Sequence, residues 1–293
     1  MTKRTVFILG AGASMPYGFP SGHKLVGDIV GVLKSKKSHF SSWGFLEKEI
    51  DNFRDAVVNS VTDAIDDLLI QRKEEFLEIG KLAIAHALTY YEIEHKLYDR
   101  NNPENWYGYL FEHLKGMSSM DLEGGTNSII TFNYDRSLEH YLSMASEGFY
   151  GLTDNVKKRA IQNIPIIHIH GSLGLLPIHS GHFPYEPTSD TEVIFGMSRN
   201  LKLIDEEADV SLLAKAHSLL QKAERIRFLG FGYHYTNLKK LEFTLNTKQC
   251  SDIKGTAYGL SEPDMDKIRT NYKINLDTNG KNILRFFREW DPL

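Results

Sequence analysis

The chain has 293 residues, of which 41% are hydrophobic and 25% are charged. This is long enough for one large domain or two small ones, and its composition is that of an ordinary globular protein. A formal net charge of −4 predicts no general affinity for nucleic acid or for an anionic membrane surface. The single cysteine, Cys250, excludes an intramolecular disulfide and a four-thiolate zinc site. No apolar stretch approaches the roughly 20 residues that span a bilayer, so we expect a cytoplasmic protein without a membrane partner.

Short and almost continuously apolar runs recur along the chain and predict strands that are covered on both faces. These runs are Thr5–Leu9, Asn127–Phe132, Ile164–Ile169, Arg225–Phe231 and Gly255–Leu260. Helical patterns separate the runs. Ser21 is placed to cap a helix that continues to about Leu33, and Ser261 with Pro263 opens another. Strands that alternate with helices predict an α/β fold with a Rossmann-like, doubly wound parallel sheet.

Residues 45–115 interrupt this alternation, because they contain helical patterns and no strand pattern. The expected helices are Phe45–Asn59, Ala64–Arg100 with an interruption, and Trp106–Lys115. We therefore expect one domain over residues 1–293 with a helical insertion at about 45–115. Residues 175–205 contain three prolines and several polar residues, and they predict a long loop with a short strand at Val193–Phe195.

A glycine-rich turn follows the first predicted strand directly. Glycine lets the backbone approach a phosphate closely, and exposed N–H groups at a helix start hold negative charge. A full dinucleotide fingerprint is missing, because no third glycine stands at the required offset and no second strand about 20 residues on ends in an acid for the ribose. Asp28 has that spacing but falls inside a predicted helix. This disfavours a hydride-transfer dehydrogenase and leaves two interpretations, a phosphate-binding turn or a tight turn without a ligand. The candidate residues are Gly10, Ala11, Gly12, Ala13 and Ser14.

Polar residues also follow the second strand, where Asn133 and Asp135 stand two positions apart. The carboxyl ends of parallel strands are where open α/β sheets bind ligands, so both side chains are candidate site residues. The alternative is that one of them caps the helix that begins near Arg136.

Two histidines end the third strand. His168 and His170 are two positions apart, so in a strand both imidazoles could line one wall. His170 could act as a general base, or both could ligate a metal with His179 or His182. That spacing matches no zinc pattern, and the next acidic residue along the chain is Glu186. Structural histidines are the third interpretation, and it suits His168 better than His170.

The fourth strand runs into a second glycine turn, with Gly230 and Gly232, that suits a phosphate or a ribose. Asn237 follows it. Its side chain could contact a ligand hydroxyl or cap the next helix.

Taken in chain order, the four strand ends resemble the sirtuin family of NAD-consuming domains. The matching segments are Gly10–Ser14, Thr131–Asp135, His170–Ser172 and Phe228–Tyr233, and the resemblance covers roughly 90 residues. It implies that Pro20 belongs to the cofactor loop, that Asn133 orients the ribose, that Asp135 binds the nicotinamide amide and that His170 is catalytic.

Two departures from the sirtuin pattern indicate which group of sirtuins the chain resembles. The zinc module of the protein deacylases needs four cysteines, so no zinc is expected here, and His23 and Lys24 stand near the position of a cofactor-loop arginine. With its helical insertion, the chain looks instead like the bacterial anti-phage sirtuin-like domains that hydrolyse NAD. The resemblance thus implies an NAD glycohydrolase that releases nicotinamide and ADP-ribose.

Two alternatives stay open. One is NAD-dependent ADP-ribosyl transfer or deacylation, in which a nucleophile other than water is used. The other is a module that senses NAD or ADP-ribose without turnover. Because a free NAD hydrolase would be toxic, we also expect regulation through a homo-oligomer or a partner protein.

Overall fold

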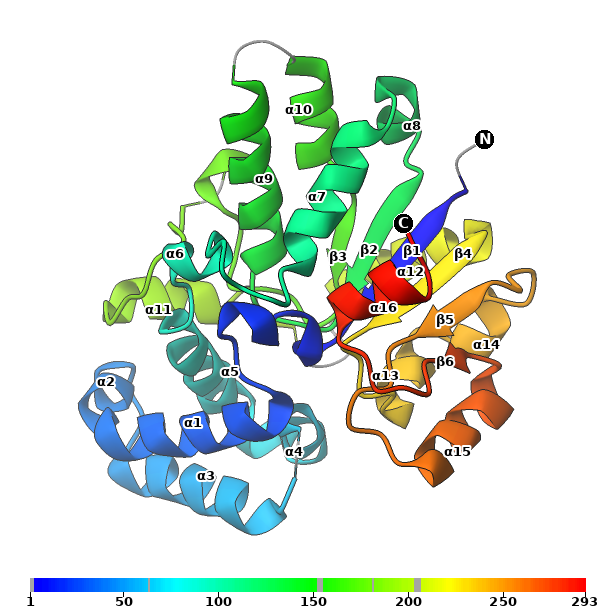
Figure 1. The fold of residues 1–293 in the computed structure, drawn as a ribbon. Coiled ribbons are helices and arrows are strands. Elements are labelled where there is room, and N and C mark those ends of the chain that lie inside the picture. The colour runs from blue at the N-terminus through cyan, green and yellow to red at the C-terminus, as the bar shows by residue number, and fades with distance from the viewer. Residues whose placement is uncertain (1–2, 63, 152–154, 181, 203–206) are drawn as a thin grey trace.

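The computed structural model describes residues 3–62, 64–151, 155–180, 182–202 and 207–293. Its centre is a six-stranded sheet in the order β3-β2-β1-β4-β5-β6 (Figure 1), and all neighbouring strands pair in parallel. This confirms the predicted α/β fold with a Rossmann-like, doubly wound sheet. The strands are β1 (Thr5–Leu9), β2 (Asn127–Thr131), β3 (Ile166–His168), β4 (Arg225–Leu229), β5 (Ile253–Gly255) and β6 (Asn275–Leu276).

Helices connect all of these strands. Between β1 and β2 lie η1 (Ala11–Ala13), η2 (Met15–Tyr17), α1 (Gly22–Ser35), α2 (Lys37–Ser42), α3 (Glu47–Ser60), α4 (Ile65–Gln71), α5 (Lys73–Thr89), α6 (Glu94–Leu97), α7 (Trp106–Gly116) and α8 (Ser119–Glu123). The later connections contain α9 (Ser137–Tyr150), α10 (Asn155–Gln162), η3 (Pro177–His179), α11 (Thr191–Ser198), α12 (Glu207–Lys222), α13 (Tyr235–Lys240), α14 (Phe243–Asn246) and α15 (Glu262–Tyr272). Helix α16 (Ile283–Glu289) follows β6.

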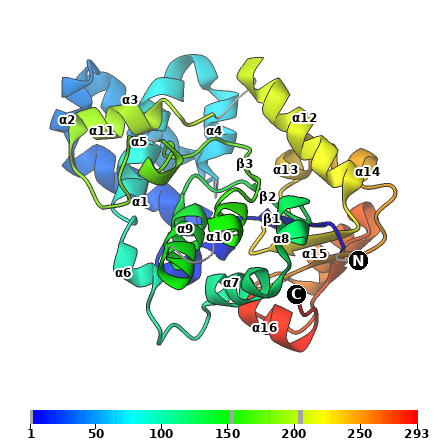
Figure 2. The same ribbon diagram turned by 90° about the horizontal axis from the view of Figure 1, so that it is seen from above.

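Two apolar cores cover the two faces of the sheet. Strand β1 contributes Phe7 and Leu9 to one core and Val6 and Ile8 to the other, because successive side chains of a strand point to opposite faces. Figure 2 shows α12 and α14 on one side of the sheet and α7 and α16 on the other. Burial on both faces explains why the strands are continuously apolar in the sequence.

The region between β1 and β2 is helical and contains residues 45–115. Helices α1, α3 and α5 pack together at the lower left of Figure 1, and α11 packs against α5. Ser21 caps α1 as predicted, since its hydroxyl accepts a hydrogen bond from the Lys24 N–H at 3.2 Å. In the part of the chain that the structure describes, no helix is long and apolar enough to cross a membrane.

The predicted strand at Val193–Phe195 is wrong, because these residues lie in α11. The Asp190 side chain accepts hydrogen bonds from two backbone N–H groups of the first turn and so starts a helix there. Ile194 and Met197, three positions apart, are the buried side of this helix.

The predicted strand Gly255–Leu260 is also wrong in its position, because β5 ends at Gly255. After it, Thr256 donates its N–H to the Phe228 carbonyl at 3.0 Å. The chain then turns through Gly259, whose φ of 77° is left-handed. Strand β6 was not predicted, since two residues are too few to give a periodic pattern.

Candidate functional site

A cavity of about 650 Å³ opens where β1 and β4 end. These adjacent strands are the switch point of the sheet, because the chain leaves them toward opposite edges. Both glycine turns line the cavity, and Asp66 of α4 and Lys281, just before α16, contribute to its wall. Its volume is in the range of small-molecule sites.

The two glycine turns pack directly against each other. The Gly12 N–H donates to the Gly230 carbonyl at 3.0 Å. A Cβ on Gly10 would lie 2.7 Å from the Gly230 carbonyl oxygen, and a Cβ on Gly12 would lie 2.8 Å from the Gly230 Cα. Gly230 itself has a φ of 57°. Close backbone packing therefore accounts for three of the predicted glycines, whether or not the turn also holds a phosphate.

Asn133 lies behind the first glycine turn. Its side-chain Nδ2 donates to the Gly10 carbonyl at 3.0 Å and to the Ser14 hydroxyl at 3.1 Å. Its side chain is not among those that line the cavity. The structure thus brings Asn133 to the predicted turn as a support for its backbone.

Asp135 is buried next to the start of α9. It accepts hydrogen bonds from the Ser137 N–H at 3.1 Å and from the Ser137 hydroxyl. Burial raises the pKa of Asp135, and hydrogen bonds from the hydroxyls of Ser137 and Ser14 oppose this rise. Its contact with the first residue of α9 agrees with the helix-start alternative, and Asp135 does not line the cavity.

His170 lines the cavity and is only 3% exposed. Its Nε2 lies 3.1 Å from the Lys240 ammonium and its Nδ1 lies 3.6 Å from the Asp66 carboxylate. Burial lowers the pKa of His170 to about 4, with Asp66 opposing and Lys240 adding to this shift. Because an ammonium only donates hydrogen bonds, Nε2 is the acceptor and the ring proton is on Nδ1, toward Asp66. His170 is therefore neutral near pH 7.

Asp66 is a site residue that the sequence analysis missed. It projects from α4, in the helical region, and accepts a hydrogen bond from the hydroxyl of Tyr134, which follows β2. Asp66 thus connects the helical region to two strand ends. No local pattern identifies it, because it belongs to an acidic first turn like that of many helices.

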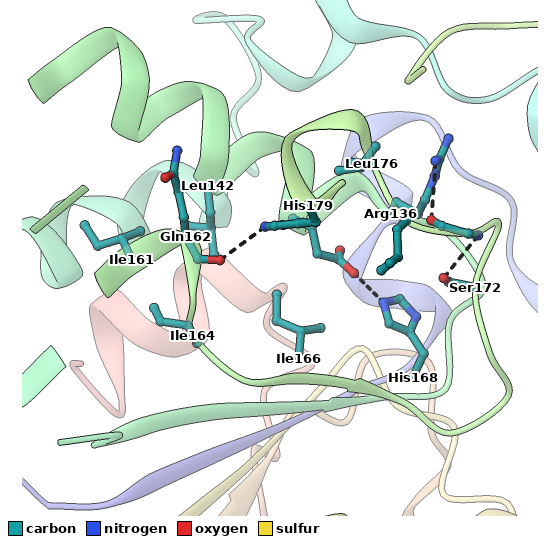
Figure 3. Close-up of a pocket in the computed structure, with 13 residues that line it drawn as sticks. Arg136, Leu142, Ile161, Gln162, Ile164, Ile166, His168, Ser172, Leu176 and His179 are labelled. Carbon is teal, nitrogen blue, oxygen red and sulfur yellow. Dashed lines mark hydrogen bonds and ion pairs between the residues drawn. The ribbon is translucent and has the colours of Figure 1, made fainter. Parts of the chain in front are cut away.

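His168 lies in a different cavity, of about 190 Å³ (Figure 3). The expectation that His168 and His170 line one wall is wrong. Strand β3 ends at His168, and Ile169 and His170 form a turn in which the two-residue alternation no longer holds. His168 Nδ1 lies 2.8 Å from the Asn133 carbonyl oxygen, and Nε2 pairs with the Glu139 carboxylate of α9.

Burial alone would lower the pKa of His168, but the charge of Glu139 and its hydrogen bond raise it above the ordinary value. In the same way, burial would raise the pKa of Glu139, and the His168 charge holds it below the ordinary value. Glu139 is a second residue that the sequence analysis missed, because it lies inside a helix that the sequence shows only as apolar and polar positions.

The remaining predicted residues divide into two groups. Ala11, Gly232 and Asn237 line the larger cavity. Asn237 lies within α13 and does not cap it. Ala13 and Pro20 are buried and do not line this cavity. Among the described residues there is no group of three or more His, Cys, Asp and Glu side chains that could hold a metal ion.

Comparison with known proteins found no family model that matches this chain and no match among curated proteins. The fold and the cavity define an α/β protein with a six-stranded parallel sheet of Rossmann-like order and a candidate ligand site at its switch point.

Proposed function

We propose that the chain binds NAD⁺ in the switch-point cavity and hydrolyses its N-glycosidic bond to nicotinamide and ADP-ribose. This proposal rests on one observation. Both glycine turns and a neutral, buried His170 line the same cavity of about 650 Å³. Such a cavity contains an imidazole that can accept a proton. A pyrophosphate in it would use N–H groups of the two turns other than those of Gly10, Gly12 and Gly230, which donate within the protein.

In this proposal the turn at Gly10–Gly12 and the turn at Gly230–Gly232 hold the pyrophosphate. Asn237 contacts a ribose hydroxyl. Ala13, Ser14 and Pro20 support the first turn from within the protein. The proposed contacts of Asn133 with the ribose and of Asp135 with the carboxamide require the Ser14 side chain to move, because its hydroxyl now bonds to both of these residues. The hydrogen bond from the Asn133 amide to the Gly10 carbonyl stays in place.

The chemistry breaks one bond and forms one. The electron pair of the ribose–nitrogen bond passes to the pyridinium nitrogen, and nicotinamide leaves as a neutral molecule. Positive charge develops on the ribose carbon, and a water oxygen attacks this carbon to form the new bond. The proton that the water loses goes to His170 Nε2 and then to solvent. General-base catalysis of this kind contributes about 10²–10⁴-fold. The step requires the Lys240 ammonium to leave Nε2 when substrate binds.

A specific observation also favours a second candidate, which is NAD or ADP-ribose binding without turnover. The His170 lone pair already accepts a hydrogen bond from Lys240 at 3.1 Å. If Lys240 stays there, the site binds a nucleotide but has no free base.

The resemblance to anti-phage domains extends the proposal to depletion of NAD during infection. A hydrolase that acts on the free NAD pool has to be restrained in an uninfected cell. We therefore include regulation by self-assembly or by a partner protein in the proposal.

The experiment is nicotinamide release from NAD⁺ by the purified chain, by His170→Ala and by His95→Ala. His95 is an exposed residue of α6 outside the cavity, so it controls for the substitution itself. Release that is lost only in His170→Ala supports hydrolysis. Binding of NAD without release supports the binding module, and the absence of binding contradicts both candidates.

A further inference from the structure

We propose that His168 and Glu139 form a positioning pair that holds Asn133, and through it the glycine turn at Gly10, in the ligand-binding arrangement. The pair does so only while both imidazole nitrogens of His168 carry a proton. Its effect on NAD affinity rests on the proposed function, whereas its effect on the glycine turn does not.

The protonation of His168 follows from its two partners. Nδ1 faces the Asn133 carbonyl oxygen at 2.8 Å, and Nε2 faces the Glu139 carboxylate. A carbonyl oxygen and an ionised carboxylate can only accept hydrogen bonds. A neutral imidazole has one N–H, so it would set a lone pair against an acceptor. Two protons on the ring, with Glu139 ionised, satisfy both contacts.

Asn133 connects this pair to the cavity. The same residue offers its carbonyl to His168 and its side-chain amide to the Gly10 carbonyl, at 3.0 Å, and to the Ser14 hydroxyl. Its own N–H donates to the Thr131 hydroxyl at 3.0 Å. The carbonyl, the N–H and the side chain of Asn133 thus all have hydrogen-bond partners, and among these partners His168 is the acid–base group.

Other charged and titratable groups face the pair from α9 and from the loop before it. Asp135 favours the charged imidazole, and Arg136 stabilises the Glu139 carboxylate. The Arg136 guanidinium is itself paired with Glu92 at 2.5 Å. His179, which also lines this cavity, lies at the end of η3 with its Nε2 3.3 Å from the Gln162 carbonyl. Figure 3 shows His168 and His179 on the wall of the same cavity.

The direction of the pH effect follows from this arrangement. The pKa of His168 is raised. The imidazolium therefore persists at pH values above the ordinary pKa of histidine, and it loses its proton as the pH rises further. On that loss one of the two hydrogen bonds disappears. A hydrogen bond to a charged group corresponds to about tenfold or more in an equilibrium constant, so we expect NAD affinity to fall about tenfold across the titration.

The first test needs no ligand. In the full chain labelled with nitrogen-15, we expect both ring nitrogens of His168 to be protonated at neutral pH, and the Gly12 amide resonance to shift as His168 titrates. Glu139→Gln lowers the midpoint of this titration. The proposal is overturned if His168 is neutral at pH 7. It is also overturned if the Gly12 amide resonance does not shift as His168 titrates.

The second test measures NAD affinity against pH for the wild type, His168→Gln, Glu139→Gln and the matched control His179→Gln. We expect the alkaline loss in the wild type and in His179→Gln. His168→Gln binds about tenfold more weakly and without that pH dependence. The same alkaline loss of NAD affinity in His168→Gln contradicts the positioning role.

Absence of NAD binding by the wild type contradicts the proposed function, and the ligand-free test then decides the proposal on the His168–Glu139 pair. If His168→Gln does not fold, Glu139→Gln carries both tests.

Discussion

The Nε2 atom of His170 lies 3.1 Å from the ammonium of Lys240. The nitrogen that would accept a proton in the proposed reaction is therefore held by a donor from α13. Asp66, on the other side of the ring, lies 3.6 Å from Nδ1. The protonation of His170 depends on which of these two neighbours is present.

Lys240→Met is predicted to raise the pKa of His170 from its value of about 4, because it removes a positive charge that disfavours the imidazolium. Asp66→Asn is predicted to lower it further. Nitrogen-15 resonances of the labelled histidine ring report both shifts. Lys239→Met is the control, since Lys239 is the exposed neighbour of Lys240 on the same helix. An unchanged pKa in Lys240→Met would show that the two groups do not interact.

His170 also predicts a loss of stability in acid. Its pKa is about 4 in the folded chain and near 6.5 in the unfolded chain, so the unfolded state binds more protons between these values. Stability from this group is present above pH 6.5 and is lost as the pH falls toward 4, by up to about 3 kcal/mol. Urea unfolding at pH 7 and pH 5 should show a smaller acid loss for His170→Gln than for the wild type. Equal losses would contradict the neutral, buried state of His170.

The ion pair of Glu92 and Arg136 is predicted to stabilise the junction of the helical region with α9. Both side chains are almost fully buried, and the guanidinium donates to Glu92 through Nε at 2.9 Å and Nη2 at 2.5 Å. Glu92→Gln leaves the arginine charge uncompensated and should cost about 3–5 kcal/mol in the free energy of unfolding.

Glu94→Gln serves as its control, because Glu94 is exposed and, within the described part of the chain, forms an ion pair with the half-buried His140 at 3.4 Å. This variant should unfold within about 0.5 kcal/mol of the wild type. Equal stability of the two variants would mean that the buried pair does not hold the junction.

Gly230→Ala is predicted to destabilise the protein, because the added Cβ would clash with the neighbouring glycine turn. Gly230 has a φ of 57°, and an added Cβ would overlap the backbone of Gly12 and Ala13. Gly280 is a matched control, because its φ is 58° and an added Cβ would meet nothing within 4 Å. Gly280→Ala should cost only the left-handed strain of about 1–2 kcal/mol. Gly230→Ala should cost clearly more in thermal unfolding, and similar costs would contradict the close packing of the turns.

The fold was largely predictable because its strands are buried on both faces. Thr5–Leu9 forms β1 with the predicted bounds, and the apolar runs near residues 127 and 225 form β2 and β4. Residues of β5 and β6 were misplaced or missed, since strands of three and two residues give too short a pattern. The helix α11 was missed because Ile194 and Met197 are too few to distinguish a helix from a strand.

The site was predictable only where it follows strand ends. The glycine turns and His170 come directly after buried strands, so the sheet itself brings them to one edge. Asp66 and Glu139 come from helices and reach the site through space, with Asp66 lying 68 positions from its partner Tyr134. Periodicity shows which helical positions are polar, but the pairing of a polar position with a particular histidine depends on tertiary packing.

The most direct test of the proposed hydrolysis is to incubate the purified full chain with NAD⁺ in water enriched in heavy oxygen. We predict equimolar nicotinamide and ADP-ribose, with one heavy oxygen atom on the ribose of the product. Intact NAD⁺ at saturating protein would contradict hydrolysis by the chain, and ADP-ribose transferred to another nucleophile would contradict water as the acceptor.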